Sequence, residues 1–256
     1  ILPLAIVACS NSRMPRIHLY LEAPPADARL LLPAAASHHL LRVLRARRGQ
    51  RLTLFSGDGW EYAAELVGVE GERAVLAVEA ARQRDTASPL HVTLALPLLK
   101  GERWDWALQK ATELGVATIQ PIHSRFCQIA LAEAQQARRQ ERWQQILIAA
   151  AEQSQATRLP QLAAPLALAD FLARPREGLG LVLDAAADSN LRALPETSPN
   201  SVTILTGPEG GLAAEEIASA REKGFYGLRL GPRILRAETA PLAILAVLQG
   251  RYGDLG

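Results

Sequence analysis

The 256-residue sequence has little of what marks disulfide-rich, zinc-binding or membrane-spanning proteins. Its two cysteines, Cys9 and Cys127, belong to no CxxC pair and to no cluster of cysteine and histidine, which argues against a zinc site and a disulfide framework. Two cysteines fit a reducing compartment, and we expect the protein to be cytoplasmic and to bind no metal. A formal net charge of +2 means that a nucleic-acid surface would need local clustering of charge. No apolar run approaches the ~18 residues of a membrane-spanning helix.

The single methionine, Met14, directly precedes residues 16–21, whose alternation predicts a first strand. We therefore interpret Met14 as the natural start, and residues 1–13 as upstream or added sequence. Residues 6–9 also resemble the end of a bacterial lipoprotein signal, but the segment is short and has no preceding basic residue. A lipoprotein binding module stays an alternative only if that segment is authentic.

Length and a hydrophobic content of 49% predict a full core in two domains, residues 14–86 and 87–256. In the first, short strands at 51–55, 62–69 and 74–79 alternate with glycine turns, which is typical of a small β-barrel-like domain. We expect Ser37 to cap a short helix over residues 38–46, and a linker near residues 82–89.

Five arginines fall within ten residues of this first domain, with no acid among them: Arg42, Arg45, Arg47, Arg48 and Arg51. They are either a solvated face or a phosphate-contacting patch, since clustered guanidinium groups supply charge and bidentate geometry. A compact β-domain bearing such a patch beside a catalytic-looking domain favours RNA. We interpret His38 and His39 as capping and packing residues.

The second domain reads as alternating strands and helices, which predicts an α/β fold with a largely parallel sheet covered by helices. The expected strands are residues 90–96, 116–121, 179–183, 202–205 and 226–230. The expected helices are residues 102–114 and 134–157, and residues 184–201 form a long connection.

Two glycine-marked loops, residues 206–212 (TGPEGGL) and 230–240 (LGPRILRAETA), each follow a short apolar run and precede a helical pattern. We expect both at the carboxyl edge of one sheet, where open α/β sheets bind ligands. No lysine follows Gly210 and Gly211, which excludes a P-loop, and the spacing does not fit GxGxxG.

The remaining chemistry is a backbone cradle around an adenosine-type cofactor, because glycines let the main chain approach closely. Polar groups would come from Glu209, Arg233, Arg236 and Glu238. The alternative for each loop is ordinary turn chemistry, with Arg236 and Glu238 as a structural ion pair.

These loops closely resemble the signature of the RsmE family, bacterial SPOUT methyltransferases that make 3-methyluridine in 16S ribosomal RNA. The resemblance covers nearly the whole chain from Met14. It extends to RVLR before Gly49, the SGDG turn at 56–59, KGE at 100–102, QKATELG at 109–115 and AEQS at 151–154. Small departures include Asp184-Ala185 where many members have His-Pro, Ser124 where an acid is common, and Ala237 in place of threonine.

The resemblance implies a PUA-like N-terminal RNA-binding domain, a trefoil-knotted SPOUT domain, a homodimer and S-adenosylmethionine as methyl donor. It implies Arg236, Glu238 and Glu209 as catalytic candidates, with Arg236 stabilising charge on the uracil and a glutamate orienting the base or taking its proton. RNA-binding candidates are Arg42, Arg45, Arg47, Arg48, Lys100 and Arg125. Cofactor-binding candidates are Leu183, Thr206, Gly207, Gly211, Leu230, Gly231, Ile234, Leu235, Thr239 and Ala240.

Two rival functions remain open from the sequence. A non-catalytic RNA-binding protein on the same fold would gain no thermal stability from S-adenosylmethionine. A nucleotide-dependent oxidoreductase would be stabilised by NAD(P) instead.

Overall fold

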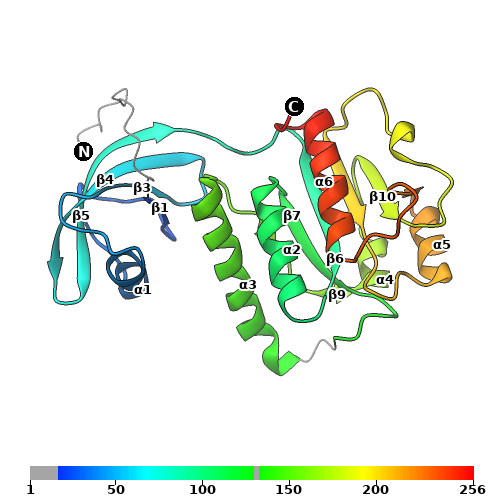
Figure 1. Cartoon of the computed structure of the whole chain (residues 1–256), viewed down its shortest axis with the longest axis horizontal. Coiled ribbons are helices and arrows are strands. Elements are labelled where there is room, and N and C mark those ends of the chain that lie inside the picture. The colour runs from blue at the N-terminus through cyan, green and yellow to red at the C-terminus, as the bar shows by residue number, and fades with distance from the viewer. Residues whose placement is uncertain (1–16, 130–132) are drawn as a thin grey trace. The chain divides into compact units, whose positions relative to one another are not determined.

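The computed structural model describes residues 17–129 and 133–256, and the chain divides into two compact units (Figure 1). The first unit comprises the residues up to 87 together with 151–158, and the second comprises 88–150 and 159–256. The proposed start at Met14, the interpretation of residues 1–13 and Cys9 lie outside the described residues. No described helix combines the length and apolar character needed to cross a membrane.

A five-stranded mixed sheet forms the first unit, in the order β1-β3-β4-β5-β2. β1 runs parallel to β3, and the other pairs are antiparallel. Alternating leucines such as Leu19, Leu54 and Leu76 are buried in its core, as the period-two pattern predicts. The sequence did not reveal the three-residue β2. The strands are β1 (Ile17–Tyr20), β2 (Arg29–Leu31), β3 (Arg51–Phe55), β4 (Trp60–Glu70) and β5 (Arg73–Gln83).

The predicted helix over residues 38–46 with Ser37 as its cap is wrong. α1 (Ala34–His38) begins after Pro33, whose ring fixes a helix-compatible φ, and continues as a π-helical turn, η1 (His39–Val43). The buried Ser37 hydroxyl instead donates to the Leu32 carbonyl at 3.2 Å and accepts from the Ala74 amide at 3.0 Å. It therefore ties the helix to β5.

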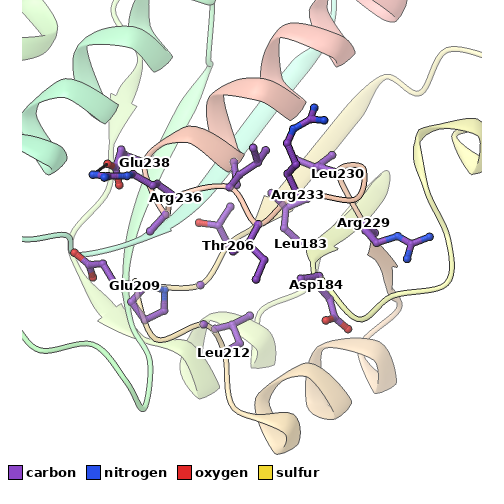
Figure 2. A pocket seen from close by; sticks show the side chains of 18 of the residues that line it. Leu183, Asp184, Thr206, Glu209, Leu212, Arg229, Leu230, Arg233, Arg236 and Glu238 are labelled. Carbon is purple, nitrogen blue, oxygen red and sulfur yellow. Dashed lines mark ion pairs between the residues drawn. The ribbon is translucent and has the colours of Figure 1, made fainter.

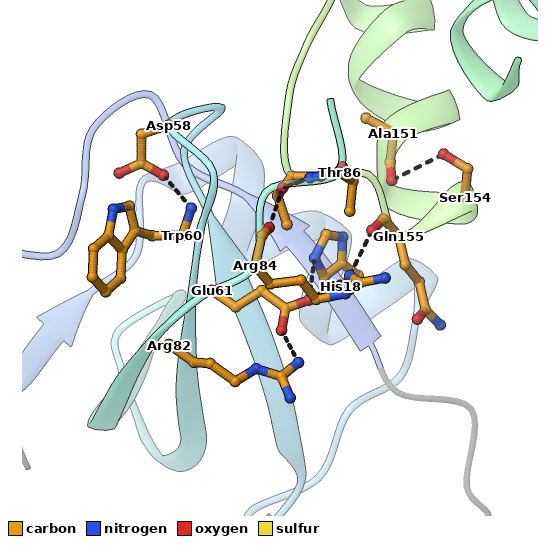
Figure 3. A network of polar contacts seen from close by, with 11 residues as sticks. His18, Asp58, Trp60, Glu61, Arg82, Arg84, Thr86, Ala151, Ser154 and Gln155 are labelled. Carbon is orange, nitrogen blue, oxygen red and sulfur yellow. Dashed lines mark hydrogen bonds and ion pairs between the residues drawn. The ribbon is translucent and has the colours of Figure 1, made fainter. Parts of the chain in front are cut away.

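Residues 151–158 join the first unit through polar contacts (Figure 3). The Tyr20 amide donates to the Glu152 carboxylate at 2.9 Å, and Arg84 donates to the Gln155 carbonyl at 2.9 Å. Thr157 accepts from the Thr86 amide at 3.1 Å. The helix expected to reach residue 157 ends at Ser154, since Gln155 adopts a φ of 57°. Its carboxyl end and the residues that follow are thus part of the first unit.

A parallel sheet in the order β12-β10-β11-β6-β7-β8 organises the second unit, and the short β9 also pairs with β7. The α/β prediction is confirmed. The sequence missed β8, β9 and α4 (Leu168–Ala173), because two-residue strands carry no periodicity. The strands are β6 (His91–Pro97), β7 (Thr118–His123), β8 (Gln161–Leu162), β9 (Leu166–Ala167), β10 (Leu179–Leu183), β11 (Ser201–Leu205) and β12 (Phe225–Leu228).

Helices cover both faces of this sheet. On one face, Val92, Leu94 and Ile204 are buried against α2 (Glu102–Glu113), α3 (Glu133–Ser154) and α6 (Thr239–Tyr252). On the other face, Ala95 and Leu205 pack with α4 and α5 (Ala214–Glu222). The long connection contains only a 3-10 turn, η2 (Leu191–Ala193).

The chain path around α6 bears on the expected trefoil knot. β12 is the edge strand of the sheet, whereas α6, the next helix, packs against α2 and the central β6. The chain therefore returns from the edge to the middle of the sheet. The threading itself stays a prediction from the family resemblance.

His18 makes the stability of the first unit depend on pH. Its ring is buried and stacks on Phe55 with centroids 4.2 Å apart, and this burial lowers the pKa of His18 from 6.5 to about 4 although Glu61 lies 3.8 Å away. In the unfolded chain His18 gains its proton near pH 6.5, so stability present above that pH is lost as the pH falls towards 4. The shift corresponds to about 3 kcal/mol.

We expect His18→Phe to remove this loss, because phenylalanine can stack on Phe55 without titrating. Hydrogen exchange of the β1 and β3 amides at pH 6.5 and pH 4.5 measures the effect, with protection falling in the wild type and much less in the variant. Equal pH dependence in the two proteins would refute the role of His18.

Candidate functional site

A cavity of about 560 Å³ opens at the carboxyl edge of the parallel sheet (Figure 2). Its walls come from the residues that follow β10, β11 and β12, and both glycine-marked loops contribute. β10 lies between β11 and β12, so Leu183 and Asp184 fill the space between the loops. The predicted position of the two loops at one sheet edge is therefore correct, although their strands are not neighbours.

The first loop needs glycine for steric reasons. A Cβ on Gly207 would lie 2.8 Å from the carbonyl carbon of Gly211 and from the amide nitrogen of Leu212. The turn is closed by the Gly211 amide, which donates to the Pro208 carbonyl at 2.8 Å, and Gly211 adopts a φ of 75°. The loop thus folds tightly and leaves main-chain groups along the cavity.

Thr206 supplies a buried polar group to the cavity. The residue is 1% exposed, and its hydroxyl has no hydrogen-bond partner among the described residues. A buried polar atom without a partner is costly, so a ligand that bonds to it would recover free energy. Leu183, Leu212 and Leu230 add an apolar wall, which gives the mixture of few polar groups and apolar surface typical of small-molecule sites.

Arg103, in the first turn of α2, contacts a carboxylate from each loop. Its Nη1 donates to Glu209 Oε1 at 3.2 Å, and its Nε lies 3.9 Å from Glu238 Oε1. Arg236 Nη1 also lies 3.9 Å from Glu238 Oε1, so the ion pair considered as the alternative interpretation of these two residues is present. One guanidinium therefore reduces the repulsion between two carboxylates at the cavity.

Glu238 is the more buried of these acids, with 9% of its surface exposed. It directly precedes α6, whose amino end favours negative charge. Its Oε2 atom is buried and accepts no hydrogen bond within the described part of the chain. The cavity thus contains a carboxylate oxygen that lacks a donor.

Most of the predicted site residues meet at this cavity. The catalytic candidates Arg236, Glu238 and Glu209 line it, and Thr239 is the one cofactor candidate outside the lining. The cofactor candidates in the lining are Leu183, Thr206, Gly207, Gly211, Leu230, Gly231, Ile234, Leu235 and Ala240.

The predicted RNA-binding residues lie elsewhere. Lys100 is exposed just before α2. Arg125 forms an ion pair with Glu215, and its amide donates to Glu216 at 2.8 Å, so acids of α5 already offset its charge. The five arginines of the cluster in the first unit are all exposed: Arg42, Arg45, Arg47, Arg48 and Arg51.

Sequence reasoning missed Arg103 and Arg229 as cavity residues. Arg103 follows the KGE block at 100–102, which follows β6 at the same sheet edge as the loops. Its place shortly after the carboxyl end of β6 is the sequence signal that points to the cavity.

Two family models match the chain: an RNA methyltransferase domain over residues 86–249 and an RNA methyltransferase PUA domain over residues 32–79. The relatives include proteins named ribosomal RNA small subunit methyltransferase E. The Synechocystis protein is 35% identical over 96% of this chain and 82% of its own length. The protein from Buchnera aphidicola (Schizaphis graminum) is 29% identical over 96% and 99%.

Solved structures agree with these matches. Ribosomal RNA small subunit methyltransferase E from Neisseria gonorrhoeae, bound to S-adenosyl methionine, superposes with a TM-score of 0.86 at 35% identity. The Lpg2936 protein of Legionella pneumophila, in complex with bound cofactor SAM, superposes with a TM-score of 0.90 at 36% identity. Each comparison covers 94% of this chain and 100% of the other.

The geometry of the first loop predicts different outcomes for two glycine-to-alanine changes. Gly207→Ala forces a backbone shift and should lower the unfolding midpoint by several degrees, corresponding to about 1–3 kcal/mol. Gly250→Ala, at an exposed helical position with open space, should be neutral or stabilise by up to about 1 kcal/mol. Scanning calorimetry measures both, and equal midpoints would contradict the tight-turn description.

Proposed function

Because the chain belongs to the ribosomal RNA small subunit methyltransferase E family, we propose that it methylates N3 of a specific uridine in 16S ribosomal RNA. It is an S-adenosylmethionine-dependent ribosomal RNA methyltransferase with a PUA-like N-terminal domain. The identity of the uridine nitrogen comes from the family, and the structural observation that supports proton removal is the buried carboxylate oxygen of Glu238, which lacks a hydrogen-bond donor.

The residues present fit the cofactor. A cavity of about 560 Å³ is within the range of small-molecule sites, and the unpartnered Thr206 hydroxyl offers a polar contact. S-adenosylmethionine supplies an electrophilic methyl group when bound. We expect backbone groups of the glycine loops and the leucine wall to hold it, through Leu183, Thr206, Gly207, Gly211, Leu230, Gly231, Ile234, Leu235, Thr239 and Ala240.

Glu238 is our candidate for the general base. Methylation at N3 replaces an N–H bond, so the proton on that nitrogen must leave. Each acid has one oxygen paired with Arg103, but Glu238 is the more buried of the two, and its Oε2 accepts no hydrogen bond among the described residues. Glu209 therefore orients Arg103 and the uracil of the target nucleotide.

Arg236 and Arg103 have different roles in this proposal. The Arg236 side chain is 76% exposed beside Glu238, so it can contact a uracil that enters from solvent. Loss of the N3 proton leaves negative charge on the uracil carbonyls, and the guanidinium stabilises it. Arg103 holds the Glu238 carboxylate and is a positioning residue.

We propose that the arginines of the first unit hold the RNA backbone. Arg42, Arg45, Arg47 and Arg48 are exposed and lack acidic neighbours in the sequence. Lys100 and Arg125 are secondary candidates, and Arg125 is partly neutralised by Glu215. Along the sequence, we propose residues 14–86 and 87–256 as the two domains, with residues 151–158 packing within the first compact unit, and the cytoplasm as the location.

A homodimer is also part of the proposal. The supporting observation is apolar exposure on two helices that pack against each other: Trp106 of α2 is 43% exposed and Val247 of α6 is 37% exposed. Exposed large apolar side chains on neighbouring elements favour a protein partner.

The direct test is nucleoside analysis of small ribosomal subunits that lack the methyl group. After incubation with the protein and S-adenosylmethionine, chromatography and mass spectrometry should detect 3-methyluridine at one position. Bound RNA without any methylated nucleoside would instead favour the non-catalytic RNA-binding alternative. Methylation at another atom would overturn the N3 assignment.

The two glutamates should respond differently to amide substitution. Glu238→Gln removes the base and should reduce kcat by about 10²–10⁴-fold, with S-adenosylmethionine affinity nearly unchanged. Glu209→Gln should cost much less, because its side chain can still accept from Arg103. Single-turnover methylation with saturating RNA and cofactor measures both. A larger loss in Glu209→Gln would exchange the two roles.

A further inference from the structure

A second cavity, of about 720 Å³, opens at the amino edge of the parallel sheet. It is lined by the first residues of β6, β11 and β12 and by the segment after α4. The glycine-loop cavity lies at the opposite ends of these strands. Since β6 has seven residues, the two sites are roughly 20 Å apart along the strands.

Polar side chains form the floor of this amino-edge cavity. Thr203, Thr93 and Thr118 are cross-strand partners on β11, β6 and β7, so their side chains form a row on the α4 and α5 face. In the next row on the same face, Leu205 and Ala95 are fully buried. No hydrogen bond within the described part of the chain uses the three hydroxyls.

Arg176 is held rigidly over the same face. A Cβ at Gly180 would lie 2.7 Å from its Cζ atom, so the glycine makes room for the guanidinium. The guanidinium lies 4.6 Å from the centroid of the Phe225 ring and donates to the carbonyls of Gly178 at 2.6 Å and Gly224 at 3.0 Å. The position of this cation is therefore fixed before any ligand binds.

The positive charge of the cavity is not balanced by acids. Among the described residues, Arg176, Arg174 and Lys223 form no ion pair, and Glu177 is the one acid in the lining. Burial lowers the pKa of Arg176, and its buried Nε has no hydrogen-bond partner among the described residues. An anion in the cavity would offset that cost.

We propose that the amino-edge cavity binds a phosphate group of the ribosomal RNA backbone, away from the target uridine. Cations attract the phosphate, and the threonine hydroxyls can donate to its oxygens or bond to a ribose hydroxyl. Arg174 and Lys223 are exposed on the rim, so a long polyanion can reach both. This inference rests on the proposed function for the identity of the ligand.

The test is RNA binding as a function of salt, using the full-length protein and a fluorescent fragment of 16S ribosomal RNA. For Arg174→Gln/Lys223→Gln, we expect the slope of log K against log salt to fall by about 1.4, the value for two contacts to single-stranded RNA. We also expect KM for RNA to rise, while kcat at saturating RNA and cofactor affinity stay unchanged. Arg192→Gln, an exposed arginine of the same unit outside the cavity, should behave like the wild type.

Thr203→Val is the matched test of the hydroxyl row, because valine keeps the shape of threonine and the strand tolerates it. It should weaken RNA binding without changing the salt slope. Wild-type binding and slope in both variants would overturn the proposal. The proposal would also be overturned if the variants lost binding of uridine monophosphate or inorganic phosphate but kept wild-type RNA binding. The ligand of the cavity would then be a small molecule. RNA binding is measured here without catalysis. A negative result for the amino-edge cavity can therefore be told apart from a negative result for the methyltransferase proposal.

Discussion

The contact of Arg103 with two carboxylates is the interaction on which the catalytic arrangement depends. Glu209 belongs to the loop after β11, and Glu238 directly precedes α6. Without a cation between them, two negative groups at one cavity would repel each other and separate the loops. The hydrogen bond at 3.2 Å and the ion pair at 3.9 Å hold both loops to the start of α2. One oxygen of Glu238 is left free for a proton.

The parallel sheet determines where these groups can meet. β10, β11 and β12 run in one direction, so the residues that follow them converge at one edge. Glycine at 207 lets the first loop turn back on itself, where a side chain would collide with the backbone at Gly211. At the opposite edge of the sheet, β11, β6 and β7 present a row of threonines that α4 and α5 do not cover completely. One sheet therefore offers two chemically different edges.

Local patterns predicted the main part of this arrangement. The apolar runs before the two glycine loops predicted β11 to within one residue and β12 to within two, and the positions of the loops predicted most of the cavity lining. Partners far apart along the chain gave no local signal. Arg103 and Glu209 are 106 positions apart, so their contact follows from the tertiary fold alone.

The first unit also contains contacts between distant residues that local sequence patterns did not predict. Ser37 looked like a helix cap, but its hydroxyl bonds across to Ala74 of β5, 37 positions away. Residues 151–158 looked like part of the second domain, yet their polar groups bond to β1 and to residues that follow β5. The row of threonines at the amino edge depends on strand register, which no single strand reveals.

A double-mutant cycle between Arg103 and Glu238 tests the account most directly. If Arg103 acts by positioning the Glu238 carboxylate, Arg103→Gln should slow methyl transfer strongly in the wild type and little in the Glu238→Gln background. The expected coupling energy in single-turnover rates is about 1 kcal/mol or more. If the two fold-reductions in rate simply multiply in the double variant, the coupling energy is zero. That result would contradict the central role of this ion pair.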